Sequence, residues 1–548
     1  MAGSALTGRL SVQTLFPSNK DFFMNTAVSS SPASGQKGAL QRFLDIVERG
    51  GNALPHPIIM FFYFAVGTVA LSALLSLIGV SVTYDAMDRA SGELVPTTVA
   101  IKSLLTADGV RFMFTNAINA FTGHAALGTI LVAMLGVGVA EYSGLISAML
   151  KRMVLATPKS LLTPILVFAG IMSNIASDAG YVVLVPLGAI VFMSFGRHPL
   201  AGIAAAFAGV SGGFSANLVI GSTDPLLGGI STEAARIMDP TYMVTPVANY
   251  YFMVVSTFLI TILGTIVTDK IVEPRLGSYG GDMGEKADAM TPEELAGLKR
   301  AKWSFFALVA LLCALIIPEA APLRDPASGQ ILGNSPFMQS IILILTALFL
   351  IPGAAYGFGS KTFESAEGVV QGMVKSMSTM ASVLVIIFVS AQFVSYFTYS
   401  NLGIVAAVSG ADLLNNIGFT GLPLAVAMVL LSAVVNLFMG GASSKWLIMA
   451  PVFIPMFMQM GFTPEYTQVA YRIGDSTTNI ITPLMTYFPI IASFAARYQE
   501  ENGPKIGMGT VISMMMPYTF FFLGGWIVLF IVWSMLNLPL GPGAVMFM

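Results

Sequence analysis

Long stretches without a single charged residue govern what this chain can fold into. Only 10% of its 548 residues are charged, and 55% are hydrophobic. A helix crosses the bilayer core with about 20 apolar residues, and the core rejects isolated charges. The sequence therefore predicts a helical, multi-pass protein of the inner membrane. The uncharged stretches that reach this length are Pro55–Tyr84, Pro240–Thr268, Pro326–Ser360, Ser376–Ala411 and Ile506–Met548.

The composition argues against several other function classes. A net charge of −2 gives no electrostatic basis for binding nucleic acid. The single cysteine, Cys313, excludes an intramolecular disulfide and a multi-cysteine metal site. The histidines lie far apart, and the chain has no Gly-rich Lys motif for nucleotide phosphates. We therefore expect no enzyme activity and no resident cofactor, with Na⁺ or H⁺ as a coupling ion.

Residues 1–40 are predicted to form a disordered cytoplasmic tail. Met1–Phe23 lacks the continuous apolar core of a signal peptide, and Ser29–Lys37 is rich in Ser, Pro and Gly. Translation from Met1 or from Met24 is equally compatible with this sequence. Positive charges near the first helix place the N-terminus in the cytoplasm. These charges are Lys20, Lys37, Arg42 and Arg49.

The first half, residues 41–268, contains an apolar stretch with a polar interruption. Residues 161–195 are broken by the run Ser173–Gly180, so that each arm has only about 15 residues. Arms this short predict a re-entrant hairpin from the cytoplasmic side, with its polar tip near mid-membrane. Residues 199–227 are interpreted as a spanning helix broken at Ser215–Asn217 and Gly221–Pro225. Unbroken helices are expected at about 57–82, 123–150 and 243–268.

The second half, residues 303–548, follows a charged cytoplasmic linker at 269–302. It holds a second predicted hairpin at 421–460, interrupted at Gly440–Lys445, and a broken helix at 464–496, interrupted at Gly474–Asn479. The fold class predicted is all-α integral membrane, with about nine transmembrane helices plus two re-entrant helical hairpins in an inverted repeat. The remaining helices are expected at about 303–318, 338–356, 377–397 and 507–536.

The two interrupted regions match at a fixed offset of 265 residues without gaps. The order of hairpin tip, proline, turn and broken helix recurs in both. Charges place the first hairpin inside and the second outside, and such inverted repeats are typical of secondary transporters. The matched pairs are Asp178 with Ser443, Tyr181 with Trp446, Pro186 with Pro451, Gly196 with Gly461, Pro199 with Pro464, Gly209 with Gly474, and Ser211 with Ser476.

Polar side chains cluster at the helix breaks. A severed membrane helix is tolerated where a cavity, ion or ligand satisfies its backbone. Free helix N-termini suit a carboxylate, and unwound carbonyls suit a cation. Ligation by oxygen alone fits a hard cation such as Na⁺, although such residues also join helices to one another. The oxygen-bearing side chains are Asn174, Ser177, Asp178 and Asn217 in the first half, and Asn436, Ser443, Asp475, Thr478 and Asn479 in the second.

Arg472 and Asp475 lie three residues apart on one helical face. Either they form a structural pair, or Arg472 binds a substrate carboxylate while Asp475 binds a proton or cation. Lys445 and Trp446 offer charge and an aromatic face at the second tip, although a lysine there can also extend to the interface.

At these residues the chain resembles the p-aminobenzoyl-glutamate transporter (AbgT) family, from about Gln41 onward. The matching motifs are Ser173-Asn174-Ile175-Ala176-Ser177-Asp178-Ala179-Gly180-Tyr181, Gly221-Ser222-Thr223-Asp224-Pro225, Gly441-Ala442-Ser443-Ser444-Lys445-Trp446, and Tyr471-Arg472-Ile473-Gly474-Asp475 through Pro483. The resemblance implies a homodimer and a small anionic aromatic substrate. It implies either p-aminobenzoyl-glutamate transport or export of sulfonamide antimetabolites, coupled to H⁺ or Na⁺.

The resemblance also implies functional positions, with Asn436 and Asp475 as the Na⁺ ligands. Pro464 and Pro483 are among these positions, although prolines there can simply shape a helix start and a break. The full set is Asp178, Asn436, Ser443, Trp446, Pro464, Arg472, Asp475 and Pro483.

Three hypotheses follow. The first is a cation-coupled carrier that works by alternating access. The second is an intramembrane aspartyl protease in which Asp178 and Asp475 share a proton. The third is an ion channel. The sequence leaves the transport direction and the choice between H⁺ and Na⁺ open.

Overall fold

The computed structural model describes residues 55–87, 94–176, 180–281, 289–331, 335–500 and 506–548. The predicted tail at 1–40, with Met24, lies outside the described residues. So do Ser177 and Asp178, the acid predicted at the first hairpin tip.

Apolar helices form the outside of the structure. Helix α3 (Pro57–Ile78) buries only four of its 22 residues, as expected for a helix that faces lipid. Within the described ranges, seven helices are long and apolar enough to cross a membrane, or eight if the bent pair α6 and α7 is one span. The prediction of a helical multi-pass membrane protein is therefore confirmed. Several further helices, such as α9, are too short or too charged for that test.

The segment expected to connect the first two helices is largely structured. Strand β1 (Ser81–Met87) pairs antiparallel with β2 (Leu94–Ala100), with Ser81 opposite Ala100. Helix α4 (Ala107–Thr122) follows, and Thr106 caps it by accepting a hydrogen bond from Gly109 N–H at 3.1 Å. Gly123 and His124 separate α4 from α5 (Ala125–Tyr142). The sequence analysis missed α4 because its mixed charge hides a single apolar face, which packs against α17 (Ala381–Tyr399).

Each predicted hairpin consists of two helical arms. The first comprises α7 (Leu162–Ser173) and α8 (Val185–Ser194), and the second comprises α19 (Gly421–Phe438) and α20 (Ala442–Gln459). The first broken segment consists of α9 (Pro199–Phe207), the π-helix η5 (Ala208–Gly212) and α10 (Thr223–Ala235). The second consists of α21 (Pro464–Thr478) and α22 (Phe488–Ala496).

Helix boundaries in the two halves recur at the same offset of 265 residues as the sequence identities. Both first arms end at the offset, both second arms end there, and both broken segments begin and resume there. A left-handed glycine also follows the second arm in each half. The boundary pairs are Ser173 with Phe438, Ser194 with Gln459, Gly196 with Gly461, Pro199 with Pro464, and Thr223 with Phe488.

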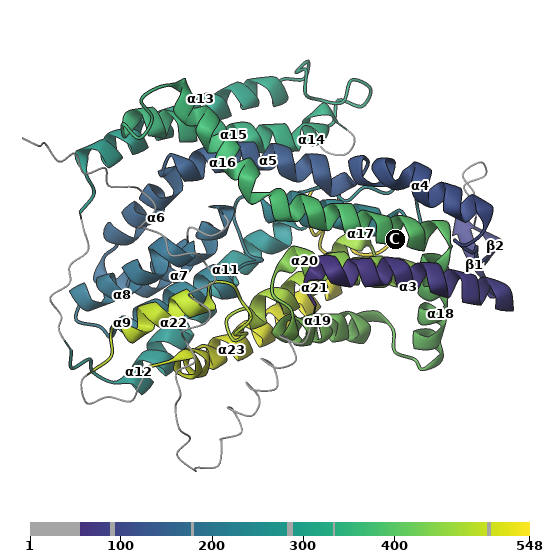
Figure 1. Ribbon diagram of the computed structural model, residues 1–548. Helices are drawn as coiled ribbons and strands as arrows, with labels where there is room; N and C mark the ends of the chain where they lie inside the picture. The colour runs from purple at the N-terminus through teal and green to yellow at the C-terminus, as the bar shows by residue number, and fades with distance from the viewer. Residues whose placement is uncertain (1–54, 88–93, 177–179, 282–288, 332–334, 501–505) are drawn as a thin grey trace, which may run out of the picture. The chain divides into compact units, whose positions relative to one another are not determined.

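The other elements surround these two repeats (Figure 1). Helix α11 runs through η6 into α12 and ends at Leu276, and α13 begins at Pro292, so the non-helical connection is shorter than the linker expected at 269–302. The bounds are α6 (Leu145–Leu155), α11 (Tyr250–Val267), η6 (Thr268–Val272), α12 (Glu273–Leu276), α13 (Pro292–Ile316), α14 (Pro336–Gln339), α15 (Ile341–Gly359), α16 (Ala366–Thr379), α18 (Leu402–Asn416) and α23 (Met508–Met535).

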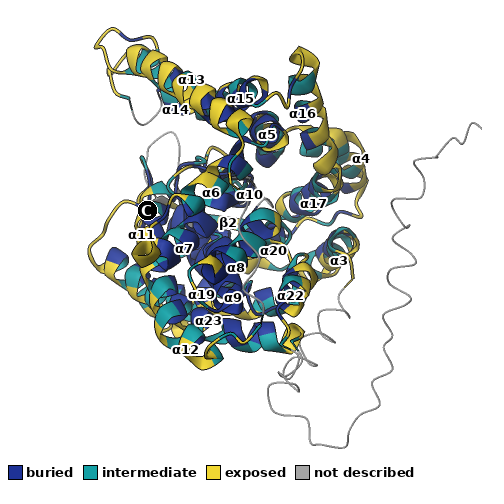
Figure 2. Ribbon diagram, turned by 90° about the vertical axis from the view of Figure 1, so that its left-hand side faces the viewer, coloured by how far each residue is buried: buried dark blue, intermediate teal, exposed yellow. Residues whose placement is uncertain are grey.

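The broken segments form the most buried part of the structure. All nine residues of α9, all five of η5 and all fifteen of α21 are buried. Figure 2 shows α7, α8 and α9 largely dark blue, whereas α13 and α16 carry exposed faces. Because α21 contains charged residues, its burial forces each of them to find a partner within the protein.

Two glycines bring the broken segments close to the first hairpin arms. A Cβ on Gly209 in η5 would lie 2.3 Å from the Val167 carbonyl oxygen of α7. A Cβ on Gly474, at the same offset, would lie 2.3 Å from the Val429 carbonyl oxygen of α19. Only glycine therefore permits this backbone approach in either half.

We predict that Gly209→Ala lowers the melting temperature in detergent, because the added methyl group overpacks the α7 crossing at a cost of about 1–3 kcal/mol. Fluorescence-detected size-exclusion after heating measures it. The control is Gly67→Ala in α3, where an added Cβ would meet nothing within 4 Å. Equal melting temperatures for the two variants would contradict the packing argument.

Candidate substrate and cation site

The candidate site lies where α10, α19 and the first turn of α20 meet α21. These helices lie side by side in the centre of Figure 1. Lys445 and Trp446 in the first turn of α20 are 1% and 0% exposed, and Asp475 in α21 is 1% exposed. A lysine this deeply buried does not extend to the interface, so that alternative for Lys445 is wrong.

Lys445 holds two of the predicted site residues. Its Nζ lies 2.5 Å from Asp475 Oδ1 and also donates a hydrogen bond to Asn436 Oδ1. The sequence analysis noted Lys445 but did not place it in the site. Its ammonium group satisfies the same two side-chain oxygens that were predicted to bind Na⁺.

Asn436 also ties the first arm of the second hairpin to the end of α21. Its Nδ2 donates to the Asp475 carbonyl oxygen at 2.6 Å, to Thr478 Oγ1 at 2.9 Å and to Asn479 Oδ1 at 3.0 Å. The last four carbonyls of a helix have no intrahelical partner, and Asn436 satisfies one of them. The structure therefore brings Asn436, Asp475 and Asn479 together.

Arg472 pairs with Asp224 rather than with Asp475. Arg472 NH2 lies 2.7 Å from Asp224 Oδ1, while Asp224 Oδ2 accepts a hydrogen bond from Gly221 N–H at 2.7 Å. The proposed Arg472–Asp475 pair is therefore wrong, since the two residues face different helices. Asp224 is a site residue that the sequence analysis missed. The signal was present, because Asp224 is an acid inside an intramembrane break.

An aromatic and amide network fills the space between these ion pairs. Trp446 stacks on Tyr471 with ring centroids 4.4 Å apart, and its Nε1 donates to Ser231 Oγ at 2.9 Å. Tyr471 Oη donates to the Ala442 carbonyl at 2.5 Å and lies 3.2 Å from Asp475 Oδ1. Gln468 accepts a hydrogen bond from Ser231 at 2.6 Å. Tyr471 and Ser231 thus engage Trp446 in this conformation.

The end of the first hairpin's first arm approaches the Asp224 break. A Cβ on Gly221 would lie 3.3 Å from the Asn174 carbonyl oxygen, and Asn174 Oδ1 is buried without a hydrogen-bond partner. The first hairpin therefore lies near the Arg472–Asp224 pair, and the second contributes Lys445 to the other pair.

The remaining predicted residues take more peripheral positions. Ser443 lies in the first turn of α20, and Pro483 follows the end of α21. Pro464 begins α21 behind its cap Thr463, far along the helix from Asp475. Asn217 accepts a local hydrogen bond from Val219 N–H at 3.4 Å.

Two hairpins and two broken segments that end at buried ion pairs, within a shell of apolar helices, define a secondary membrane transporter. The chain belongs to the AbgT putative transporter family, whose model matches residues 42–548. The resemblance found in the sequence is therefore confirmed.

Relatives and solved structures agree with this family. The chain is 38% identical over 517 residues to the p-aminobenzoyl-glutamate transport protein of Escherichia coli (strain K12), which covers 94% of this chain and 99% of that protein. The structure of the Alcanivorax borkumensis YdaH transporter matches with a TM-score of 0.82 and 45% identity, over 89% of this chain and all of that one. Neisseria gonorrhoeae MtrF, described with a class of antimetabolite efflux pumps, matches with a TM-score of 0.85 and 48% identity, over 92% of this chain and all of that one.

We predict that Asp224→Asn destabilises the protein by about 3–5 kcal/mol, because it leaves the Arg472 guanidinium buried and unpaired. The double variant Asp224→Asn with Arg472→Gln, which buries no charge, should regain part of that stability. Melting temperatures in detergent measure both effects.

The control is Asp108→Asn, which breaks an ion pair with Arg111 that spans 2.7 Å but is largely exposed. Such a pair is worth about 0–1 kcal/mol. If Asp224→Asn melts with Asp108→Asn, the Arg472–Asp224 pair does not hold the site together.

Proposed function

We propose that this protein carries p-aminobenzoyl-glutamate or related anionic aromatic solutes, including sulfonamide antimetabolites, across the inner membrane by cation-coupled alternating access. One observation carries the proposal. Two buried ion pairs, Arg472–Asp224 and Asp475–Lys445, join a single helix, α21, to two different elements. The names of the E. coli and N. gonorrhoeae relatives support the substrate class.

Arg472 is the proposed partner of the substrate carboxylate. Its NH2 contacts Asp224, while its buried Nε has no hydrogen-bond partner among the described residues. A guanidinium can bind a carboxylate through two parallel hydrogen bonds. A substrate carboxylate that replaces Asp224 would therefore keep the buried charge paired and would release α10 from α21.

Asn436 and Asp475 are the proposed site of the coupling cation. Their side-chain oxygens suit Na⁺ by type, but both contact the Lys445 ammonium in this conformation. Na⁺ can take these oxygens only if Lys445 withdraws, which frees the second hairpin from α21. Binding of the cation and separation of α20 from α21 are linked in this way, as a coupled carrier requires.

The alternatives fit the geometry less well. An aspartyl protease needs two carboxyl groups that share one proton. Asp475 lies 2.5 Å from a lysine ammonium, which stabilises its charged form and opposes proton sharing. A channel gives no reason for two buried ion pairs on one helix. A homodimeric assembly and a cytoplasmic N-terminus remain part of the proposal.

Flux into proteoliposomes tests the transport proposal. With a pH gradient and a Na⁺ gradient imposed separately, we expect saturable movement of p-aminobenzoyl-glutamate or a sulfonamide under at least one gradient. Arg472→Gln should reduce this flux about tenfold or more, because it removes the carboxylate partner. Flux that rises linearly with concentration and ignores both gradients would support a channel.

A Lys445→Met variant tests the cation site. Because it frees Asn436 and Asp475, added NaCl should raise its melting temperature more than that of the parent chain. Choline chloride at equal concentration controls for ionic strength. Lys375→Met removes an exposed lysine on α16 and serves as the matched variant.

The double variant Lys445→Met with Asp475→Asn should lose the Na⁺ response, because it removes the carboxylate ligand. This variant also serves if the single one folds poorly. An identical Na⁺ response in the parent, the single and the double variants would mean that Na⁺ binds elsewhere.

A further inference from the structure

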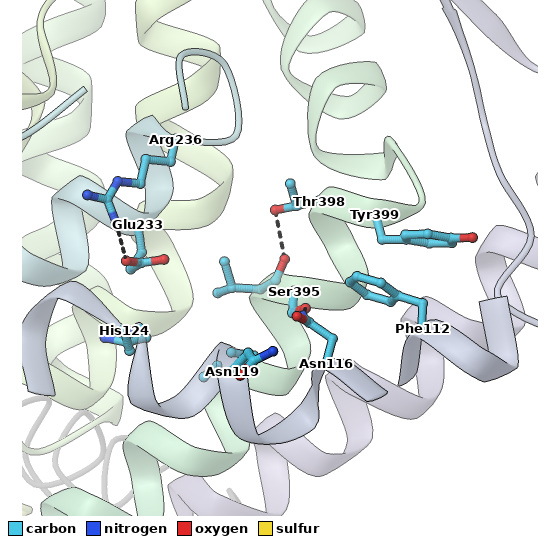
Figure 3. Close-up of a pocket in the computed structure, with 13 residues that line it drawn as sticks. Phe112, Asn116, Asn119, His124, Glu233, Arg236, Ser395, Thr398 and Tyr399 are labelled. Atoms are coloured by element: carbon cyan, nitrogen blue, oxygen red, sulfur yellow. Dashed lines mark hydrogen bonds and ion pairs between the residues drawn. The ribbon is translucent and has the colours of Figure 1, made fainter. Parts of the chain in front are cut away.

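A cavity of about 380 Å³ lies between α4, α10 and α17, among residues that none of the preceding arguments used. We call it the distal cavity. Figure 3 shows Glu233, Arg236 and His124 at one end and Phe112 with Tyr399 at the other. Its volume falls within the usual range for small-molecule sites.

The charged end holds hydrogen-bond donors without partners. Glu233 Oε1 accepts from Ala125 N–H at 2.9 Å and from Arg236 NH1 at 3.0 Å, whereas Arg236 Nε is buried and has no partner. His124 is 4% exposed, and its Nδ1 accepts from Ala126 N–H at 3.3 Å. A neutral imidazole with Nδ1 as acceptor carries its proton on Nε2.

His124 Nε2 is also buried without a partner. A buried donor left unsatisfied costs about 1–3 kcal/mol, so two of them in the lining of one cavity indicate a missing acceptor. A carboxylate is the acceptor that best satisfies a guanidinium and an imidazole N–H.

The other end of the distal cavity is aromatic. Phe112 and Tyr399 are stacked, with ring centroids 4.2 Å apart and an angle of 19° between the planes. Asn116 Nδ2 donates to Ser395 Oγ at 2.9 Å between the two ends. An aromatic wall opposite a cationic end fits a solute with a ring at one end and a carboxylate at the other.

One helix connects the distal cavity with the site at α21. Asp224, near the start of α10, pairs with Arg472, and Ser231 accepts from Trp446. Glu233 is in the last turn of α10, and Arg236 directly follows it. A helix rises about 1.5 Å per residue, which separates Asp224 from Arg236 by about 18 Å. The two sites therefore lie at opposite ends of one rigid element.

We propose that the distal cavity is a second binding site for an aromatic carboxylate, with Arg236 and His124 binding the carboxylate and Phe112 and Tyr399 flanking the ring. The proposed function supplies the identity of the solute, as the one that is transported. The existence of the site depends only on the cavity and its donors. Solute enters or leaves the α21 site by way of this second site.

Binding of labelled p-aminobenzoyl-glutamate to the full chain in lipid nanodiscs tests the proposal. We expect two binding events per chain in the parent, and one in Arg472→Gln. Adding Arg236→Gln to Arg472→Gln should weaken the remaining event about tenfold or more. In flux measurements, Arg236→Gln alone should raise KM about tenfold and leave the maximal rate within about twofold.

Two further variants complete the design. Ala120→Phe fills the cavity from α4 without touching Arg236 and should abolish the same binding event. Arg111→Gln on α4 removes an exposed arginine that also pairs with an acid three residues away, and should change nothing.

Each outcome separates this proposal from the transport proposal. Flux that depends on Arg472 but not on Arg236 or Ala120 would overturn the distal site and leave the carrier intact. Binding that depends on Arg236 without any flux would support the distal site and count against the carrier. If the parent binds no probe, the assignment of an aromatic carboxylate to the distal cavity fails.

Discussion

A charge on a buried membrane helix must be paired, and α21 carries two such charges of opposite sign three residues apart. Arg472 is 4% exposed and Asp475 is 1% exposed, and all fifteen residues of α21 are buried. Their partners come from other elements, Asp224 from α10 and Lys445 from α20. The two ion pairs therefore determine which helices can lie against α21. The breaks around them follow from the same requirement, since they supply the polar groups that surround buried charges.

This constraint shapes how the helices can move. Removing one partner of a buried ion pair costs about 3–5 kcal/mol, which is comparable to or larger than the few kcal/mol that separate two conformations of a protein. A helix that leaves α21 without a replacement would therefore be strongly disfavoured. Exchange of partners avoids that cost: a substrate carboxylate can replace Asp224, and a cation can replace the Lys445 ammonium. Each proposed ligand is thereby tied to the release of one particular element, α10 or α20.

The sequence predicted the places where the helices break but not how their charges pair. Breaks are local, because Gly, Ser, Asn and Asp interrupt apolar runs, and both hairpins and both broken segments lie where those interruptions occur. Pairing is not local. A spacing of three residues suggested Arg472 with Asp475, whereas each residue faces a helix from a distant part of the chain. Asp224 and Lys445 were present in the quoted motifs, but no local pattern specifies their partners. Helix α4 was missed for a related reason, since its apolar face is defined by α17.

Helix α10 links these features in one element. Its first turn pairs with Arg472, its middle contacts Trp446 through Ser231, and its last turn carries Glu233, which holds the N-terminal N–H of α5. A helix of 13 residues transmits displacement along its axis, because its own hydrogen bonds resist compression. Loss of the Asp224 contact at one end therefore changes the position of Glu233 and Arg236 at the other. If occupancy of the distal cavity shifts α10, the affinity at Arg472 must change by the same factor in the reverse direction, since coupling between two binding sites is reciprocal.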